Sequence, residues 1–561
     1  MKIIDSRRIT GPCLISDFPG AMLEVSVSDF NQDELIQSWQ RHANALLNGV
    51  DWKPPISQFR KYVDGASLYI SAPVDALYSA TEVNEEAWNR AVADLNGSVS
   101  EPLSTAVSRL KEIISNEVNP QILEVKKEAE KHSVQFLVDD DFVSVGMGNG
   151  SLTFPGNEIP PLDEINWNKV NDIPVILVTG TNGKTTTVRL LESIFGEAGY
   201  FTGTTSTDGV RINSETVKEG DYSGSEGARE ILRTKEINTA ILEVARGGIL
   251  RRGVVDVNAS AAIITNVADD HLGDYGINSV EEMALTKFVV RKTLRYNAPL
   301  VLNANDELLK REAENYDGKI IWFSSPEENI AKDELYKTGE LCCVKNGNFV
   351  FYSEGNSEVI TKVTEVPVTL NGAAKHNVEN CLGAIALAKG IGIKREAIQK
   401  GLINFGSSYE NNPCRANLIE SNGIKIMLDF AHNPHGLRAI VEMVKQIPAT
   451  RRLILLGQAG DRSNVDIEKL VTAASYLNPD KIIAAEIPKY LRGREREEVP
   501  NLIKKYFVEN GTAEENISIV SEMAKGVENA LAWSQKGDFL LLLVLDQRDE
   551  IYELIQEFLK H

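Results

Sequence analysis

The chain of 561 residues is too long for one typical hydrophobic core, so two to four domains are expected. Its apolar fraction of 42% and charged fraction of 25% are ordinary for a globular protein, and its formal net charge of −21 argues against a nucleic-acid partner or an anionic membrane. No apolar run is long enough to predict a membrane span, and the opening MKIIDSRRITGP lacks the apolar core of a signal peptide. The five scattered cysteines have no CxxC spacing and fit reduced thiols, so we expect a cytoplasmic protein.

Residues 1–170 form the first region, which the pattern predicts to be an α+β domain. A strand is expected at 23–27 and a helix at 33–47, and amphipathic helical segments follow between Pro102 and His132. The segment PGNEIPPLDEINW, with three prolines and several acids, is interpreted as a linker. The region carries no catalytic signature, so the chemistry is expected further along the chain.

From residue 171 the chain alternates short apolar strands with helical segments, which is typical of a doubly wound α/β fold. The strand IPVILVTG opens this pattern, and ILRTKEINTAILEVA, ASAAIITNVA and APLVLNA continue it. The pattern lapses at FGSSYENNP and resumes with IKIMLDFAH, RRLILLGQAG, DKIIAAEI and DFLLLLVLD. We therefore predict a central P-loop α/β domain over 171–412, with a mostly parallel sheet, and a C-terminal Rossmann-like α/β domain over 413–561.

The sharpest local signal is the glycine-rich segment VTGTNGKTT, which joins a buried strand to the helical segment TTVRLLESIFGEAG. Glycines let the backbone wrap a phosphate, and the helix N-terminus offers free N–H donors. Lys184 would neutralise the β- and γ-phosphates, and Thr185 would coordinate Mg²⁺. The residues expected to bind the nucleotide in this loop are Gly180, Thr181, Asn182, Gly183, Lys184, Thr185 and Thr186.

The loop alone leaves the function open. The usual GxxxxGK[ST] pattern has glycine where this chain has Val178, and a plain strand-to-helix turn would give a similar sequence. A GTPase, a kinase and a ligase can all begin with such a loop. Motifs elsewhere in the chain must decide among these reactions.

Glu243 in AILEVARGG and His271 in TNVADDHLGDYG follow predicted strands, where doubly wound sheets place their ligands. A carboxylate suits Mg²⁺, whereas a histidine in such a loop is more often a hydrogen-bonding residue. Lys287 lies on a predicted helix, EEMALTKFVV, where a solvated lysine is the ordinary interpretation. These three residues are candidates for a metal or phosphate site.

Five motifs stand in a fixed order along the chain, namely TGTNGKTTT, LEVARGG, TNVADDHLGDYG, KHNVEN and LDFAHNPHG. In this order they resemble the Mur ligase family. STDGV, ARGGILRRG, GQAGDR and YLRGRERE are most similar to the Mur-like half of cyanophycin synthetases. The resemblance covers residues 171–561, and MKIIDSRRITGP is similar to the N-terminal domain of the same branch.

The resemblance implies a ligase that uses ATP and Mg²⁺, and it assigns a role to each matching residue. Lys287 lies where several family members carry a carbamylated lysine. The residues that would hold Mg²⁺ are Thr185, Thr205, Glu243 and His271. The residues with catalytic roles would be Lys184, Glu243, His271, Lys287 and Arg415.

The resemblance also implies a nucleotide site shared between the two α/β domains. Asn377 and Asn380 would contact adenine, and Arg415 in the triplet PCR would reach phosphate although Cys414 replaces the usual glycine. Asp429 would bond the ribose and His432 would lie near the phosphates. The alternative for Asp429 and His432 is a structural cap where a strand enters its loop.

The segment between residues 135 and 175 is too short for the ATP-grasp module that cyanophycin synthetases carry, so one ATP site is expected. We therefore predict a ligase that forms an acyl phosphate and joins an amino acid or other small amine to an acidic amino acid or peptide. Arg492 and Arg494 in YLRGRER would either bind the acidic substrate or belong to a solvated loop.

Two other functions stay open. One is a P-loop ATPase or kinase that passes phosphate to another acceptor, and the other is a nucleotide-binding scaffold subunit. The intact Lys184, Glu243 and His271 weigh against the scaffold. Residues 1–170 are expected to bind the acidic acceptor or to mediate assembly, and a homo-oligomer would fit the second role.

Overall fold

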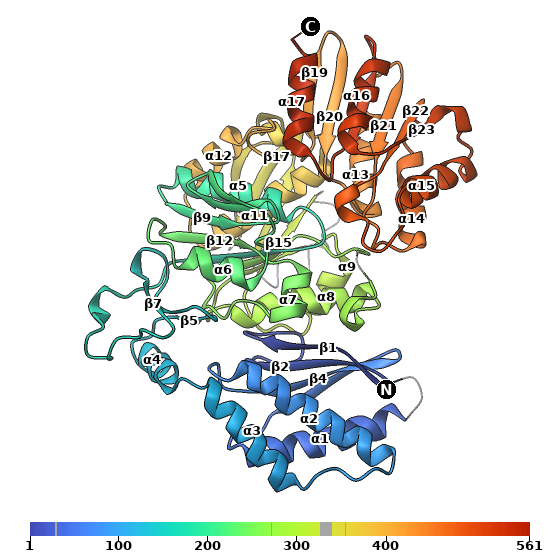
Figure 1. The fold of residues 1–561 in the computed structure, drawn as a ribbon. Helices are drawn as coiled ribbons and strands as arrows, with labels where there is room; N and C mark the ends of the chain where they lie inside the picture. Colours follow the sequence, from blue (N-terminus) through green and yellow to red (C-terminus); the bar gives the residue numbers. More distant parts are fainter. Residues whose placement is uncertain (28–30, 271, 326–338, 354, 561) are drawn as a thin grey trace.

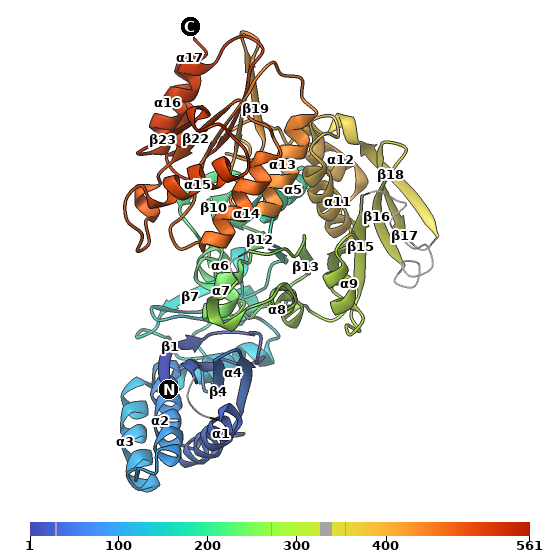
Figure 2. The same ribbon diagram turned by 90° about the vertical axis from the view of Figure 1, so that its right-hand side faces the viewer.

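The computed structural model describes residues 1–27, 31–270, 272–325, 339–353 and 355–560. Over these residues the chain forms four β-sheets, of four, three, eleven and six strands. Figures 1 and 2 show a blue N-terminal part, a green and yellow central part and an orange and red C-terminal part in a row. No helix within the described ranges is long and apolar enough to cross a membrane.

The four-stranded N-terminal sheet is antiparallel, with the strand order β1-β2-β4-β3. Helices cover one face and the other face turns toward the central part, so β2 and β4 are buried over most of their length (Figure 1). The predicted strand at 23–27 and helix at 33–47 are confirmed as β2 and α1. The elements are β1 (Lys2–Ile9), β2 (Gly20–Ser26), α1 (Gln32–Gly49), β3 (Ser57–Tyr62), β4 (Gly65–Ser71), α2 (Leu77–Leu95) and α3 (Leu103–Glu117).

Residues 120–170 form a second, smaller unit with its own hydrophobic core. The segment expected to be a linker helps to close this core, because Ile159 and Ile165 are buried in it. The Trp167 ring also stacks on His132, with 4.5 Å between the ring centroids. The linker prediction is therefore wrong, since this segment packs into a folded unit. The elements are α4 (Pro120–Lys131), β5 (Phe136–Val138), β6 (Phe142–Val145) and β7 (Leu152–Pro155).

The central sheet is mixed and mostly parallel, as predicted. Its order is β11-β10-β9-β12-β8-β13-β14-β15-β16-β17-β18, in which the strands from β9 through β16 run parallel and two antiparallel strands extend each edge. The strands are β8 (Val175–Thr179), β9 (Thr202–Thr205), β10 (Gly209–Ile212), β11 (Glu215–Glu219), β12 (Thr239–Glu243), β13 (Ala261–Ile264), β14 (Leu300–Asn303), β15 (Ile320–Ser324), β16 (Glu340–Lys345), β17 (Asn348–Ser353) and β18 (Asn356–Lys362).

Helices cover both faces of this sheet, which confirms the doubly wound arrangement. The continuous apolar run of β8 follows from this, because every residue of that strand is buried. One face carries α5 (Lys184–Glu197), α11 (Lys375–Gly390) and α12 (Arg395–Asn404). The other carries α6 (Ser225–Leu232), α7 (Arg246–Arg252), α8 (Val280–Phe288) and α9 (Glu307–Ala313).

The C-terminal sheet has the order β19-β20-β24-β21-β22-β23, with β19 antiparallel and the other five strands parallel. It too is covered on both faces. The strands are β19 (Asn417–Ser421), β20 (Ile424–Asp429), β21 (Arg452–Leu456), β22 (Lys481–Ala485), β23 (Ile517–Val520) and β24 (Phe539–Leu543). The helices are α13 (Pro434–Lys445), α14 (Asn464–Ser475), α15 (Glu498–Glu509), α16 (Met523–Trp533) and α17 (Arg548–Phe558).

A cavity of about 1820 Å³ lies where these parts meet. Its walls include residues that follow β8, β12 and β13 in the central part and β20, β21 and β24 in the C-terminal part. Parallel strands of α/β sheets place ligands at their carboxyl ends. The topology therefore directs the loops of two sheets, and the sequence motifs on them, into one space.

Candidate active site

The phosphate loop joins β8 to α5 and is held by the residues that follow β13. The Thr181 N–H donates to the carbonyl of Asn266 at 2.9 Å, and the Asn182 N–H donates to the Asn266 side-chain oxygen at 2.9 Å. The Thr265 hydroxyl donates to the carbonyl of Asn182 at 2.6 Å. The TN pair of TNVADD thus fixes the loop, a role that the sequence did not indicate.

Two positions of the loop require glycine. Gly180 has a φ of 150°, and a Cβ there would lie 1.8 Å from the Thr265 hydroxyl. Gly183 has a φ of 83°, and a Cβ there would lie 2.2 Å from the side-chain oxygen of Asn380. Both glycines therefore serve close packing as well as backbone conformation.

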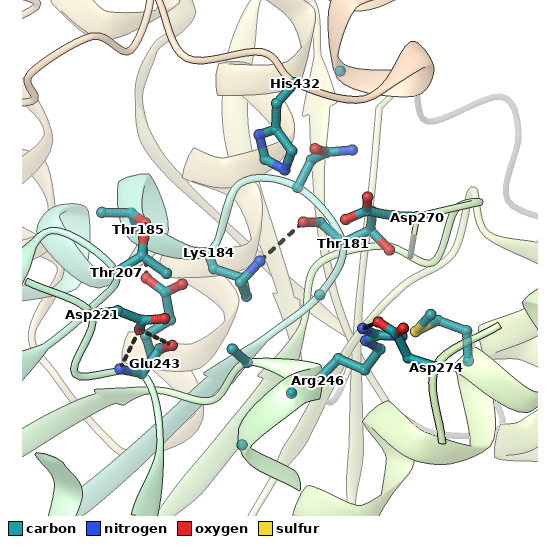
Figure 3. Close-up of a pocket in the computed structure, with 18 of the residues that line it drawn as sticks. Thr181, Lys184, Thr185, Thr207, Asp221, Glu243, Arg246, Asp270, Asp274 and His432 are labelled. Carbon is teal, nitrogen blue, oxygen red and sulfur yellow. Dashed lines mark hydrogen bonds and ion pairs between the residues drawn. The ribbon is translucent and has the colours of Figure 1, made fainter. Parts of the chain in front are cut away.

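Lys184 begins α5 and extends into the cavity (Figure 3). Its ammonium donates to the carbonyl of Thr181 at 3.0 Å, so the charge is held over the loop. Thr186 lines the cavity as well, and its hydroxyl accepts a hydrogen bond from the Asn412 side chain at 3.2 Å. The predicted loop residues therefore surround a place where a chain of phosphates would lie.

Glu243 ends β12 and is buried beside the loop. Its Oε2 accepts a hydrogen bond from the Thr185 hydroxyl at 2.8 Å, whereas its Oε1 is buried and has no hydrogen-bond partner among the described residues. Burial raises the pKa of Glu243, and the charge of Lys184 opposes that rise. An unpartnered carboxylate oxygen next to hydroxyl oxygens is a donor set that fits Mg²⁺.

Thr205, one of the expected metal ligands, lies away from the cavity. Thr205 is buried within β9 and does not line the cavity, because the strand still holds its side chain inside the sheet. Thr207 lies in the loop beyond the strand, and its hydroxyl is 3.4 Å from that of Thr185 (Figure 3). Thr207 is thus the threonine of this segment that lines the cavity, and His271 lies outside the described residues.

Lys287 in α8 is buried and lines the same cavity. Burial lowers its pKa to about 7, and the nearby charge of Lys184 contributes to this shift. The interpretation as a solvated helix lysine is therefore wrong. A lysine of this kind is present in both the protonated and the neutral form near neutral pH.

The start of α11 supplies polar groups to one end of the cavity. His376, Asn377 and Asn380 line it, and the Asn377 amide donates to the carbonyl of Val368 at 3.0 Å. The Asn380 amide donates to the Asn377 side-chain oxygen at 3.1 Å. The Nδ1 of His376 is buried without a partner within the described part of the chain, and burial lowers the pKa of this side chain to about 4.

The C-terminal part contributes Arg415 and Asp429 to the cavity. Cys414 and Ala416, on either side of Arg415, adopt φ values of 52° and 55°, so cysteine takes a conformation that glycine would adopt more easily. The Asp429 carboxylate accepts hydrogen bonds from the N–H groups of Ala416 at 2.8 Å and Ala431 at 2.7 Å. Asp429 therefore lines the cavity and also acts as the structural cap that was the alternative interpretation.

Burial raises the pKa of Asp429 to about 6, and the charge of Arg415 opposes that rise. His432 lines the cavity above Lys184 and Thr181, and burial lowers its pKa to about 4 (Figure 3). Its Nδ1 lies 3.1 Å from the carbonyl of Phe430. This wall of the cavity therefore holds a neutral imidazole near the phosphate loop.

Several contacts join the central and C-terminal parts across the cavity. The Asn433 amide donates to the side-chain oxygen of Asn182 at 2.9 Å, so α13 begins directly above the phosphate loop. Asp270 pairs with Arg462 at 2.9 Å. These contacts hold the two parts against each other beside the phosphate loop.

The N-terminal sheet reaches the opposite end of the cavity. Ile4 and Val63 line it and are 61% and 77% exposed. The sheet is anchored by Arg60, whose guanidinium donates to the carbonyls of Tyr275 at 2.6 Å and Gly276 at 2.9 Å. Three parts of the chain therefore contribute walls to one cavity.

The two arginines of YLRGRER have different environments. Arg492 lines the cavity and pairs with Asp461. Arg494 donates to the carbonyls of Gly460 at 2.9 Å and Arg462 at 2.6 Å, and it does not line the cavity. Arg494 organises a loop, so Arg492 alone of this pair keeps the role of a candidate substrate contact.

Several residues at the site were not predicted from the sequence motifs. Thr207 and Asp208 lie in STDGV, a family motif to which the sequence assigns no role, and Asn266 lies in the same motif as His271. Arg548 begins α17, lines the cavity and carried no sequence signal, because only the fold brings it to the site.

Comparison with known proteins explains this constellation. Residues 178–388 match the Mur ligase middle domain, and residues 414–543 match the glutamate ligase domain of Mur ligases. The chain belongs to the Mur ligase family. The two matched domains contain the phosphate loop, Glu243 and Lys287 in the first and Asp429 in the second.

Two curated relatives show how far this membership extends. A cyanophycin synthetase of Geminocystis herdmanii is 35% identical over 395 residues, which cover 70% of this chain and 45% of that protein. A UDP-N-acetylmuramoyl-L-alanyl-D-glutamate–2,6-diaminopimelate ligase of Clostridium botulinum is 24% identical over 415 residues, covering 70% of this chain and 79% of that protein. The chain thus spans less than half the length of the cyanophycin synthetase that it matches.

Solved structures support the same fold. E. coli FolC in complex with DHPP and ADP superposes with a TM-score of 0.51 at 21% identity, over 68% of this chain and 89% of FolC. MurF from Acinetobacter baumannii superposes with a TM-score of 0.50 at 18% identity, over 69% of this chain and 77% of MurF. These similarities show the fold of the α/β parts.

Proposed function

We propose that this protein is an ATP-dependent ligase that activates a carboxylate as an acyl phosphate and joins it to an amine. The observation that carries the proposal is the convergence of a phosphate loop, the oxygen ligands Thr185 and Glu243, and polar groups of a second α/β sheet in one cavity. Membership of the Mur ligase family supports the same reaction.

In this proposal ATP lies across the central and C-terminal parts. The loop N–H groups and Lys184 bind the phosphates, and His376, Asn377 and Asn380 surround the base. Glu243, Thr185 and Thr207 would hold Mg²⁺, which supplies charge neutralisation at the phosphates when bound. Arg415 adds a guanidinium from the other wall.

The reaction proceeds in two steps. A carboxylate oxygen attacks the γ-phosphorus, the bond from that phosphorus to the β–γ bridging oxygen breaks, and ADP leaves. The neutral amine then attacks the acyl carbon, orthophosphate departs with the former carboxylate oxygen, and the nitrogen loses a proton to give the amide. The closed contacts around Asn182 and Asp270 would keep water from the acyl phosphate.

The substrates that we propose are an acidic amino acid or peptide as the acceptor and an amino acid or other small amine as its partner. Arg492 offers a forked donor for a carboxylate within the cavity. The N-terminal sheet, through Ile4 and Val63, would border the acceptor. Similarity to cyanophycin synthetase supports this choice of substrate class.

Two alternatives use the same loop. A P-loop ATPase or kinase would release or transfer phosphate without needing both an acid and an amine. A scaffold subunit would bind nucleotide without turnover. The geometry of the phosphate loop and the burial of Glu243 are compatible with all three functions, so a measurement of the reaction must separate them.

The test is a phosphate-release screen of acidic amino acids and peptides combined with each amino acid, with mass spectrometry of the products. We expect release to require both substrates and to be lost by at least about a hundredfold in Lys184→Ala. Phosphate release that is independent of the amine would favour the ATPase or kinase. If no pair is turned over while ATP binds normally, the ligase proposal fails and the scaffold is favoured.

A further inference from the structure

A buried carboxylate at the junction of the central and C-terminal parts collects three guanidinium groups. Asp208 lies between β9 and β10, and its carboxylate is 2.6 Å from Arg548, 3.3 Å from Arg189 and 3.7 Å from Arg415. Arg189 belongs to α5, whereas Arg415 and Arg548 come from the C-terminal part. The cluster therefore joins the two α/β bodies.

The carboxylate of Asp208 is shared by three guanidinium groups. Two further buried acids lie close to the cluster: the charge of Arg189 acts on Glu192, which also bonds Arg211 at 3.1 Å, and the charge of Arg415 acts on Asp429. Within the described residues, Asp208 is the only carboxylate that pairs directly with Arg415 and Arg548. Each guanidinium carries five N–H donors, so both can also bind a second anion.

Two of the three guanidinium groups reach the cavity. Arg415 and Arg548 line the cavity together with Lys184 and Glu243. Both guanidinium carbons also lie over the ring of Phe430, at 4.7 Å and 4.3 Å from its centroid. These contacts restrict where the two guanidinium groups can move.

The connection to the metal ligands is short. Asp208 directly follows Thr207, whose hydroxyl is 3.4 Å from that of Thr185. Thr185 in turn donates to Glu243 at 2.8 Å. The loop that carries the carboxylate is thus the same loop that reaches the proposed Mg²⁺ ligands.

We propose that Arg548 acts with Arg415 as a second guanidinium for the γ-phosphoryl group of ATP, and that Asp208 positions both. The inference rests on the proposed function in that it takes ATP as the bound nucleotide. Paired guanidinium groups suit a phosphoryl group because each presents forked N–H donors. Asp208 would act through the two arginines, as a positioning residue.

The experiment compares the affinity for Mg²⁺-AMPPNP with the affinity for Mg²⁺-ADP by calorimetry. In Arg548→Gln we expect AMPPNP binding to weaken about tenfold while ADP binding changes by less than about twofold, because ADP lacks the γ-phosphoryl group. Asp208→Asn should also lower the ratio of the affinity for AMPPNP to the affinity for ADP. Arg548→Lys keeps the positive charge but loses the forked pair of N–H donors, so its affinity for AMPPNP should fall about threefold.

Arg451→Gln is the matched control. Arg451 also pairs with an aspartate, Asp538 at 2.6 Å, and lies 3.9 Å from the ring centroid of Trp533, but it does not line the cavity. Its loss should leave the preference for AMPPNP unchanged.

The inference would be overturned if the folded Arg548 and Asp208 variants bound both nucleotides equally more weakly, or bound both with unchanged affinity. The cluster would then be a structural ion pair. If circular dichroism shows that Arg548→Gln does not fold, Arg548→Lys decides by the same ratio. The proposed function fails separately, through absence of amide formation, because nucleotide preference is measured without acid or amine.

Discussion

At the scale of single residues, Glu243 shows how burial and bonding set the chemistry of the site. One carboxylate oxygen is bonded to Thr185, and the other has no partner in the described part of the chain. Such a group is costly when charged and alone, which is why its pKa is raised. A divalent cation would remove that cost, so metal binding and ionisation of Glu243 should be coupled.

We expect Glu243→Gln to raise the Mg²⁺ concentration needed for half-maximal activity by at least about tenfold, because the amide keeps the shape and the bond to Thr185 but loses the charge. The measurement is phosphate release against Mg²⁺ concentration. Glu192→Gln serves as the control, since Glu192 is also a buried glutamate but bonds Arg211 outside the cavity. An unchanged Mg²⁺ requirement in Glu243→Gln would contradict the metal site.

Lys287 gives a prediction about pH and carbon dioxide. Burial and the charge of Lys184 lower its pKa to about 7, so the amine is protonated below that pH and neutral above it. A neutral amine can add CO₂ to give a carbamate with release of a proton. Activity should therefore rise with pH through about 7 and should increase when bicarbonate is restored to CO₂-depleted enzyme.

The control for this prediction is Lys287→Arg, which stays protonated and should not respond to bicarbonate. Equal responses of the parent and the variant would show that the buried amine is not the group that reacts.

At the scale of elements, the site depends on how closely the phosphate loop packs against α11. The side chain of Asn380 in that helix occupies the space that a Cβ at position 183 would need. The loop and the helix can therefore pack this closely only because Gly183 has no side chain.

Gly183→Ala should consequently displace the loop, and we expect a loss of ATP affinity of about tenfold or more with the overall fold retained. Nucleotide binding by calorimetry, with circular dichroism for the fold, checks this. Gly196→Ala is a suitable control, because a Cβ at that position in α5 meets no atom within 4 Å. Normal ATP binding in Gly183→Ala would show that the loop tolerates the shift.

The strand, loop and helix around Lys184 could be predicted from the sequence because apolar periodicity and glycine spacing are local properties. The same holds for Glu243, which directly ends a buried strand. Thr207 could not be distinguished from Thr205 in this way, since the choice depends on where β9 ends. Arg548 could not be found at all, because it is 340 residues from Asp208 and only tertiary packing joins them.

The interpretation of PGNEIPPLDEINW failed for a related reason. Proline and acidic residues are typical of linkers, but the buried contacts of Ile159 and Ile165 are made with α4 and its small sheet. Composition describes the segment itself and does not reveal a partner that lies elsewhere in the chain.

At the scale of the whole molecule, the N-terminal part forms one end of the cavity, and this can be tested with a charge. Val63 lies at the tip of the β3–β4 hairpin, is 77% exposed and lines the cavity. In Val63→Asp a new negative charge should repel an acidic acceptor by about 1 kcal/mol near water, which corresponds to about a fivefold rise in its KM.

The kcat and the KM for ATP should not change in Val63→Asp. Val99→Asp is the matched control, because Val99 is 98% exposed and does not line the cavity. If the KM for the acceptor rose in both variants, the cause would be the net charge of the protein. If it rose in neither, the N-terminal part would not take part in acceptor binding.

The division of the cavity among three separately packed bodies has a consequence for denaturation. Most of the hydrophobic core of each body lies within that body, and polar contacts such as those of Asn182, Arg60 and Asp208 contribute much of what joins the walls of the cavity. Such contacts cost less to break than a core, so the bodies should separate before any of them unfolds. Low urea should therefore abolish catalysis while far-ultraviolet circular dichroism stays native, and addition of ATP should move the loss of activity to higher urea. Coincident loss of activity and secondary structure, with or without nucleotide, would mean that the enzyme melts as one cooperative unit.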